Sequence, residues 1–328
     1  MKNLNFKIPP TGLAFIGCGN ATRMHSRTLR GIDGLERYYA SRSGERAASF
    51  NEKLGGSGAF GSYEAAMADE RIDVVLVATP PASHLELVLA ALDAGKHVIV
   101  EKPPFLRSTD FHDVREAARR AGRRVYVAEN YYYKPILEKL RELIGEGVIG
   151  EVRILSINAL KRQETGDWRD HEELAGGGAL YEGGIHWVSF MASLGLPVSA
   201  VQGFRPGVGG EMEKSMLVVF TYGQGAVGTL YYSWEIGSPL KGLRLSTIYG
   251  SEGTITFESN GLLLVVRGKR KRLMMPDPGD LLGYKAMFRD FLGSLHGNHE
   301  PRFTLEMARR DLELVEDVYE SLQNGDGS

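Results

Sequence analysis

The first third of the chain alternates short apolar runs with longer stretches in which apolar residues recur at helical spacing. The apolar runs predict strands over residues 13–16, 37–40, 74–78, 98–100 and 125–127. The stretches between them predict helices over residues 21–29, 47–54, 84–94 and 110–121, the last two stopped by Gly95 and Gly122. Strands that alternate with helices are typical of a doubly wound parallel sheet with helices on both faces.

The pattern changes after residue 130, where strands dominate. They are expected over residues 152–159, 200–204, 216–222, 226–234, 243–249, 254–257, 262–266 and 272–275. Because several of these strands follow one another through short turns, their sheet is expected to be mostly antiparallel. Helices are expected on either side of it, over residues 134–144 and 305–322. We therefore predict two domains, residues 1–129 and residues 130–328.

Composition and charge narrow the class of protein. With 43% hydrophobic and 24% charged residues in 328, the chain resembles ordinary folded proteins. Lys and Arg number 39 against 41 Asp and Glu, so no overall positive charge favours nucleic acid as a partner. The lone Cys18 allows no internal disulfide, and no apolar run is long enough for a membrane span or a signal peptide. We expect a cytoplasmic protein without nucleic-acid or membrane partners, and no metal site.

A glycine-rich turn stands directly between the first predicted strand and the first predicted helix. It consists of Gly17, Cys18, Gly19, Asn20 and Ala21, followed by Thr22 where the dinucleotide-binding pattern often has a third glycine. Its two glycines permit a tight turn and the close approach of a pyrophosphate, whose charge is favoured at a helix N-terminus. This placement predicts a dinucleotide site, and the alternative is a plain strand-to-helix turn.

The end of the second predicted strand indicates which dinucleotide binds. In such folds a carboxylate there binds the ribose hydroxyls of NAD, whereas an arginine accommodates the 2′-phosphate of NADP. This chain has Ser41 and Arg42 at that turn, and a guanidinium flanked by hydroxyls suits a phosphate dianion. We therefore favour NADP(H) over NAD(H), while Glu36 and Glu45 keep NAD(H) open.

Two further strand ends carry polar residues. Thr79, Pro80 and His84 follow the most apolar strand, and Glu101 and Lys102 follow the next one. Ligands in open parallel sheets bind beyond the carboxyl ends of the strands, so these residues are expected near the cofactor. The alternatives are a capped helix start for the first group and a simple ion pair for the second.

The second domain holds a glycine-rich segment, residues 176–186, which also contains Glu182 and His186. On a regular helix these two side chains share one face, where one can tune the protonation of the other. The glycines indicate close approach of the backbone to another group, or simply a tight loop.

Taken together, these segments resemble one known family over nearly the whole chain. The ordered motifs are Gly17-Cys18-Gly19, Ala78-Thr79-Pro80 with His84, Glu101-Lys102-Pro103, Trp168-Arg169, and the run from Gly176 to His186. They are similar to those of the glucose-fructose oxidoreductase, inositol dehydrogenase and rhizopine-catabolism (Gfo/Idh/MocA) family. The resemblance implies an α/β protein with an N-terminal Rossmann domain, a doubly wound parallel sheet, and a C-terminal α+β domain with a large, mostly antiparallel open sheet.

The resemblance also implies roles for individual residues. Lys102 would lie beside the reacting hydroxyl or carbonyl, and His186 would donate or accept the proton. Glu182, a third catalytic candidate, stands where the family usually has aspartate. Ser189 stands three residues after His186, where an aspartate is common. Both are departures from the family pattern.

Further positions match residues that surround the reacting centre in relatives. By this resemblance, the nicotinamide end of the cofactor would be approached by Asn130, Trp168 and Arg169. The substrate pocket would have as wall candidates Tyr131, Tyr132, Tyr133 and Tyr284, for each of which core packing is the alternative.

The function implied is hydride transfer between NAD(P) and a sugar, sugar derivative or polyol. One alternative is a glycosidase of the same superfamily that oxidises its sugar transiently and keeps its cofactor bound. Another is a sugar-sensing regulator that has lost catalysis. Family members commonly assemble through the open sheet, which implies a homodimer or homotetramer.

Overall fold

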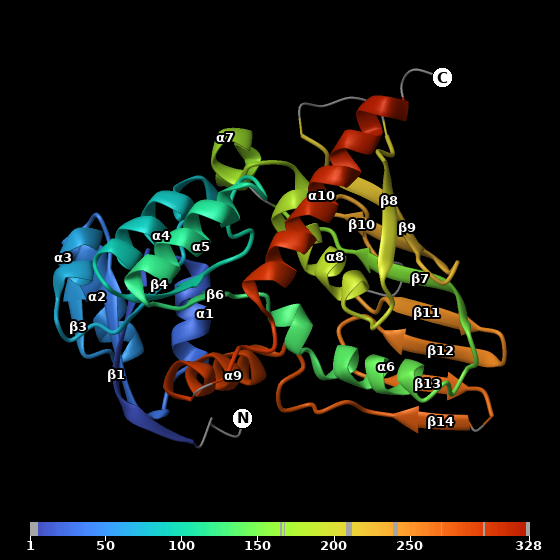
Figure 1. Cartoon of the computed structure of the whole chain (residues 1–328), viewed down its shortest axis with the longest axis horizontal. Helices are drawn as coiled ribbons and strands as arrows, with labels where there is room; N and C mark the ends of the chain where they lie inside the picture. The colour runs from blue at the N-terminus through green and yellow to red at the C-terminus, as the bar shows by residue number, and fades with distance from the viewer. Residues whose placement is uncertain are drawn as a thin grey trace. The chain divides into compact units, whose positions relative to one another are not determined.

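The structure is a computed structural model that describes residues 6–164, 166, 168–207, 212–238, 242–269, 271–297 and 299–325. By their internal contacts the residues form two compact units. One comprises Met1–Glu129 with Tyr284–Arg309, and the other comprises Asn130–Gly283 with Arg310–Ser328 (Figure 1).

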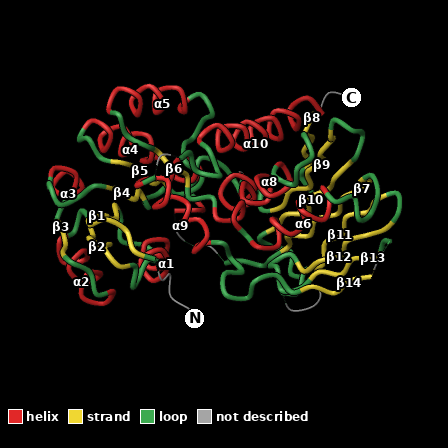
Figure 2. The backbone as a smooth tube through the Cα atoms, turned by 60° about the horizontal axis from the view of Figure 1, so that its bottom comes forward, coloured by secondary structure: helices red, strands yellow, loops and turns green. Residues whose placement is uncertain are grey.

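In the first unit, six described strands form a sheet in the order β3-β2-β1-β4-β5-β6, with every pair parallel. The strands are β1 (Lys7–Ile16), β2 (Asp33–Ala40), β3 (Gly58–Phe60), β4 (Val74–Val77), β5 (His97–Val100) and β6 (Val125–Val127). The helices between them are α1 (Asn20–Thr28), α2 (Gly44–Leu54), α3 (Tyr63–Ala68), α4 (His84–Asp93) and α5 (Asp110–Ala121). They flank this sheet on both sides (Figure 2). The predicted doubly wound Rossmann sheet is confirmed.

The strand order indicates at which edge of the first sheet a ligand would bind. All four residues of β4 are buried, because helices cover both faces of the sheet. Strand order reverses between β1 and β4, and in open parallel sheets ligands bind beyond the strands' carboxyl ends at such a switch point. Gly17, Thr79 and Glu101 follow β1, β4 and β5, so they share that edge of the sheet.

In the second unit, eight described strands form a sheet in the order β14-β13-β12-β11-β7-β10-β9-β8. The strands are β7 (Val152–Leu160), β8 (Val198–Phe204), β9 (Ser215–Tyr222), β10 (Val227–Ser233), β11 (Leu245–Gly250), β12 (Gly253–Glu258), β13 (Leu264–Arg267) and β14 (Lys271–Met274). Only β7 and β10 pair in parallel among these, so the sheet is mostly antiparallel, as predicted.

Helices pack against one face of this second sheet. They include α6 (Pro135–Gly145), α8 (Ile185–Ala192) and part of α10 (Leu305–Gly325). Glycines let them approach closely: a Cβ on Gly228 of β10 would lie 2.8 Å from Met191 in α8, and one on Gly203 of β8 would lie 2.7 Å from Val318 in α10. Along β7 the core-facing residues are buried, whereas Ile154 on the opposite face is exposed.

Several elements differ from the sequence prediction. The pair β3 and α3 was not predicted, because elements this short carry little periodicity. Helix α9 (Tyr284–His296) was also missed. Its Phe291 stacks on Tyr126 of β6, with ring centres 4.9 Å apart. Such contacts group residues 284–309 with the first unit, whereas the sequence assigned them to the second domain.

Candidate active site

The glycine turn after β1 is fixed by main-chain packing. Gly17 has φ +100°, and a Cβ there would lie 2.8 Å from the carbonyl oxygen of Ala78 after β4. Its N–H donates to the Ala40 carbonyl at 3.0 Å, and its own carbonyl accepts from the Thr22 hydroxyl at 2.6 Å. Only glycine suits this conformation and this close approach.

The rest of the turn leaves the start of α1 open to an anion. Arg46 holds the turn by donating to the Cys18 carbonyl through Nε at 2.9 Å and Nη2 at 2.6 Å. Gly19 is the N-cap of α1 and supplies no capping side chain, and a Cβ on it would meet nothing within 4 Å. Asn20 is exposed and Ala21 half-buried. This uncapped helix start fits the pyrophosphate of a dinucleotide.

Cys18 lies inside the same turn and is buried. Its Sγ lies 3.7 Å from the Ala40 carbonyl oxygen. Burial raises the pKa of the Cys18 thiol to about 11, an effect that Arg46 partly offsets. The side chain is therefore a neutral packing group at ordinary pH rather than a reactive thiolate.

The turn after β2 presents one exposed cation. Ser41 is buried, and its hydroxyl accepts the N–H of Ser43 at 3.2 Å. Arg42 is exposed beside Tyr63, where burial raises the pKa of the tyrosine and Arg42 opposes that rise. Glu36, an alternative partner for a ribose, accepts the Tyr38 hydroxyl at 2.5 Å instead.

His84 connects the two loops that follow β4 and β5. The ring is buried, with Nδ1 2.9 Å from the Pro103 carbonyl oxygen and Nε2 2.8 Å from that of Thr79. Burial lowers the pKa of His84, and the two carbonyl oxygens oppose the shift. The sequence named His84 as a cofactor contact, and that role stays a prediction; in the structure the two ring nitrogens face these carbonyl oxygens. Thr79 and Pro80 are half-buried beside it.

Glu101 organises the backbone at Lys102. One carboxylate oxygen bonds to Nε2 of His25 in α1, and the other accepts the main-chain N–H of Lys102 at 3.0 Å. Lys102 is half-buried at the carboxyl end of β5. His25 is fully buried and lies edge-on to the rings of Tyr284 and Phe288. His25 could not be predicted from the sequence, because only the fold brings α1 beside this strand end.

Glu182 has a different helical setting from the one predicted. It lies in a π-helical turn, η4 (Leu180–Gly184), whereas His186 lies in the α-helix that follows, so they do not share regular helix geometry. Buried Glu182 pairs with Arg169, whose Nε is 3.2 Å from Oε1. Arg169 in turn lies over the Trp168 ring, 4.6 Å from its centre. The structure therefore joins Trp168, Arg169 and Glu182 in one cluster.

The glycines around η4 are required by packing. A Cβ on Gly178 would lie 1.6 Å from Oε2 of Glu213, and one on Gly183 would lie 2.2 Å from the Tyr232 hydroxyl. Buried Glu213 accepts the Leu180 N–H at 2.8 Å and anchors the start of η4. Burial also raises the pKa of Glu213.

His186 is half-buried and stacks on Tyr131, with ring centres 4.4 Å apart and planes 12° from parallel. One turn later, Ser189 is buried, and its hydroxyl has no hydrogen-bond partner among the described residues. Of the other tyrosines named from the sequence, Tyr133 is buried in the core and Tyr132 packs edge-on to it.

Asn130 and Tyr284 are placed in different units. Asn130 is buried, and its Nδ2 donates to the Leu282 carbonyl at 2.7 Å, so this amide helps to hold the chain, and its predicted contact with the cofactor stays a prediction. Tyr284 begins α9 in the first unit, against His25.

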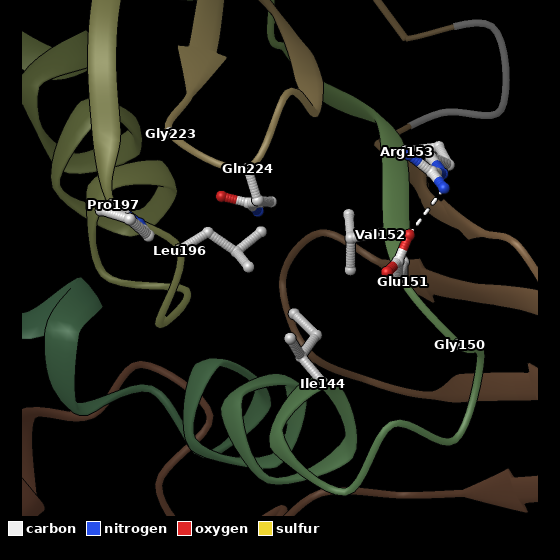
Figure 3. A pocket seen from close by; sticks show the side chains of 9 residues that line it. All are labelled: Ile144, Gly150, Glu151, Val152, Arg153, Leu196, Pro197, Gly223 and Gln224. Atoms are coloured by element: carbon white, nitrogen blue, oxygen red, sulfur yellow. Dashed lines mark hydrogen bonds and ion pairs between the residues drawn. The ribbon is translucent and has the colours of Figure 1, made fainter.

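The second unit also contains a pocket of about 580 Å³. It is lined by Ile144, Gly150, Glu151, Val152, Arg153, Leu196, Pro197, Gly223 and Gln224 (Figure 3). Its rim carries an ion pair between Glu151 and Arg153, 2.6 Å apart. None of the residues predicted for the active site lines it.

Metal-site and membrane-spanning features are absent from the described residues. In the part of the chain that the structure describes, there is no group of three or more His, Cys, Asp or Glu side chains that could hold a metal ion. None of the described helices is long and apolar enough to cross a membrane.

The fold and these motifs define an α/β protein of two units, the first of which is a Rossmann-type domain. Residues 11–129 match the model of the oxidoreductase family with an NAD-binding Rossmann fold, GFO_IDH_MocA. Residues 137–256 match the GFO/IDH/MocA C-terminal domain. The chain belongs to the GFO/IDH/MocA family.

Individual relatives share part of the sequence. D-glucoside 3-dehydrogenase of Escherichia coli K12 is 32% identical over 195 residues, which are 57% of this chain and 55% of the relative. D-xylose 1-dehydrogenase (NADP(+)) 2 of Haloferax volcanii is 34% identical over 143 residues, 43% and 44% of the two chains. The chain thus spans about half the length of the curated relatives it matches.

Solved structures share the whole fold. A levoglucosan dehydrogenase in complex with NADH and levoglucosan superposes with a TM-score of 0.84 at 21% identity, covering 96% of this chain and 97% of the other. At that level of identity the likeness shows a common fold.

Proposed function

We propose that this chain is an NAD(P)-dependent oxidoreductase that exchanges a hydride with a hydroxyl- or keto-bearing carbon of a sugar, sugar derivative or polyol. The observation that carries the proposal is that a predicted pyrophosphate site and a predicted catalytic lysine lie at the same edge of one sheet. There, the uncapped start of α1 follows β1 and Lys102 follows β5, two strands of one parallel sheet with β4 between them, and Glu101 holds the backbone of Lys102. The names of the sugar dehydrogenases among the relatives support the substrate class.

The bound nicotinamide would supply or accept the hydride. Gly17, Gly19 and the start of α1 hold its pyrophosphate, and Arg42 binds the far ribose end. Lys102, as an ammonium, orients the reacting oxygen and stabilises the negative charge that develops on it. His186 takes up or returns the hydroxyl proton. Glu182, neutralised by Arg169, fixes the turn that precedes His186.

Replacement of Arg42 tests the choice of cofactor. We expect Arg42→Ala to weaken NADPH binding about 10–100-fold, because a charge-assisted contact to the 2′-phosphate is lost. NADH binding should hardly change. Fluorescence titration with each nucleotide measures both affinities, and Arg27→Ala, an exposed arginine on α1, is the control.

Equal weakening of NADPH and NADH, or tighter binding of NADH to the unaltered protein, would contradict the preference for NADP(H). A nucleotide that survives purification and does not exchange would instead favour the glycosidase alternative.

We also propose that the protein is a homodimer or homotetramer assembled through the open face of the second sheet. This face carries apolar side chains that are 41–55% exposed: Ile154, Val227, Tyr231, Leu245 and Tyr249. Val227 and Tyr249 both pair with Ile154 across neighbouring strands, so three of them form one row. Contiguous apolar surface of this kind marks an interaction site.

Replacement in this row tests the assembly. We expect Ile154→Lys to shift the molecular mass in sedimentation equilibrium towards the monomer, because it places a charge at the centre of the row. Leu106→Lys, at an exposed leucine of the first unit, is the control and should leave the mass unchanged. A monomeric unaltered protein, or an Ile154→Lys protein with unchanged mass, would refute the proposal.

A further inference from the structure

The second unit buries a lysine completely. Lys134 immediately precedes α6, and its side chain has no exposed surface. Its Nζ donates to the Ser259 carbonyl at 3.1 Å and lies 4.3 Å from the centre of the Tyr131 ring and 5.4 Å from that of Trp187. Removing an ammonium from water is costly, and the Ser259 carbonyl and the two aromatic rings are among the contacts that offset this cost.

Tyr131 connects this ammonium to the proposed catalytic histidine. Its ring stacks on the His186 imidazole, with centres 4.4 Å apart. The Trp187 ring lies edge-on to it at 5.2 Å. One aromatic ring thus contacts both the buried cation and the imidazole.

The segment that carries Tyr131 is itself rigidly held. It is a short 3-10 turn, η2 (Asn130–Tyr133), tied by Asn130 to the Leu282 carbonyl. Gly283, with φ +77°, lies so near that a Cβ would be 2.5 Å from the Asn130 carbonyl oxygen. The position of the Tyr131 ring is therefore fixed from its backbone as well as from Lys134.

We propose that Lys134 is a positioning residue for His186 and acts through Tyr131. The ammonium holds the Tyr131 ring by a cation–π contact, which strengthens when water is excluded. The ring in turn fixes the plane of the imidazole and so aims its proton-transferring nitrogen. The role in turnover rests on the proposed function, whereas the ordering of the imidazole does not.

Kinetics test the role in turnover. We expect Lys134→Met to lower kcat about tenfold and Tyr131→Leu about 10–100-fold, each with a smaller change in KM, because a displaced proton-transfer group slows chemistry more than binding. Tyr131→Phe keeps the ring and should recover about tenfold over Tyr131→Leu. Lys139→Met, at a lysine of α6 that pairs with Glu142, is the matched control and should behave as the unaltered protein.

NMR of protein with isotope-labelled histidine tests the positioning without any turnover. The His186 resonance, assigned by its loss in His186→Gln, should be displaced by the Tyr131 ring current. It should move in Tyr131→Leu and in Lys134→Met but not in Lys139→Met. An unmoved resonance in Lys134→Met, or a Lys134→Met kcat equal to that of the control, would overturn the proposal. If the resonance moves as expected and no sugar is turned over, the proposed function fails while the positioning stands.

Discussion

Lys102→Met is expected to lower kcat about 10²–10³-fold, the cost of removing a donor aimed at a developing oxyanion. The substitution keeps most of the side-chain volume and removes only the ammonium. Affinity for NAD(P)H should fall far less than kcat, because the glycine turn and the start of α1 provide the pyrophosphate site. Steady-state turnover and nucleotide titration on the same preparation separate the two effects.

Two further variants sharpen this test. Lys102→Arg keeps the charge but changes its geometry, so partial activity is expected. Lys53→Met removes an exposed lysine of α2 and should leave kcat unchanged. Normal turnover by Lys102→Met would end the assignment of Lys102 to the reacting oxygen.

His186→Gln is expected to lower kcat about 10²–10⁴-fold, the usual worth of general acid–base transfer. Glutamine retains hydrogen-bonding capacity but does not exchange the proton, so nucleotide binding should remain nearly intact. Single-turnover absorbance of the nicotinamide measures the chemical step directly.

The matched control is His112→Gln, at an exposed histidine of α5. If the single-turnover rate of His186→Gln equals that of the control, another group must transfer the proton, and Glu182 is the next candidate.

Much of the fold could be predicted from residue pattern alone. The continuous apolar run of β4 and the caps at Gly95 and Gly122 mark a strand buried on both faces and helices that end in the left-handed conformation. Helix α9 was missed even though Met287, Phe288 and Phe291 are buried along it. Its partners in β6 and α1 are far away in sequence, so the pattern did not show which unit it joins.

Residues of the candidate site could be predicted only where a short sequence motif itself indicates a function. The turn at Gly17 and the strand end at Lys102 follow directly from motif and topology. The contacts of His25 with Glu101, of Arg169 with Glu182 and of Lys134 with Tyr131 depend on tertiary structure, and no periodicity signals them. The π-helical turn likewise changed the expected relation of Glu182 to His186.

The most direct test of the central claim is an absorbance screen at the nicotinamide band. The unaltered protein and Lys102→Met are each mixed with NADP⁺ or NAD⁺ and a panel of aldoses, glucosides and polyols, and the corresponding keto compounds are tested with NADPH or NADH. We predict that the unaltered protein forms or consumes free reduced nucleotide with at least one compound and that Lys102→Met does not. No change with any compound, nucleotide or direction, or equal rates for the two proteins, would contradict the account.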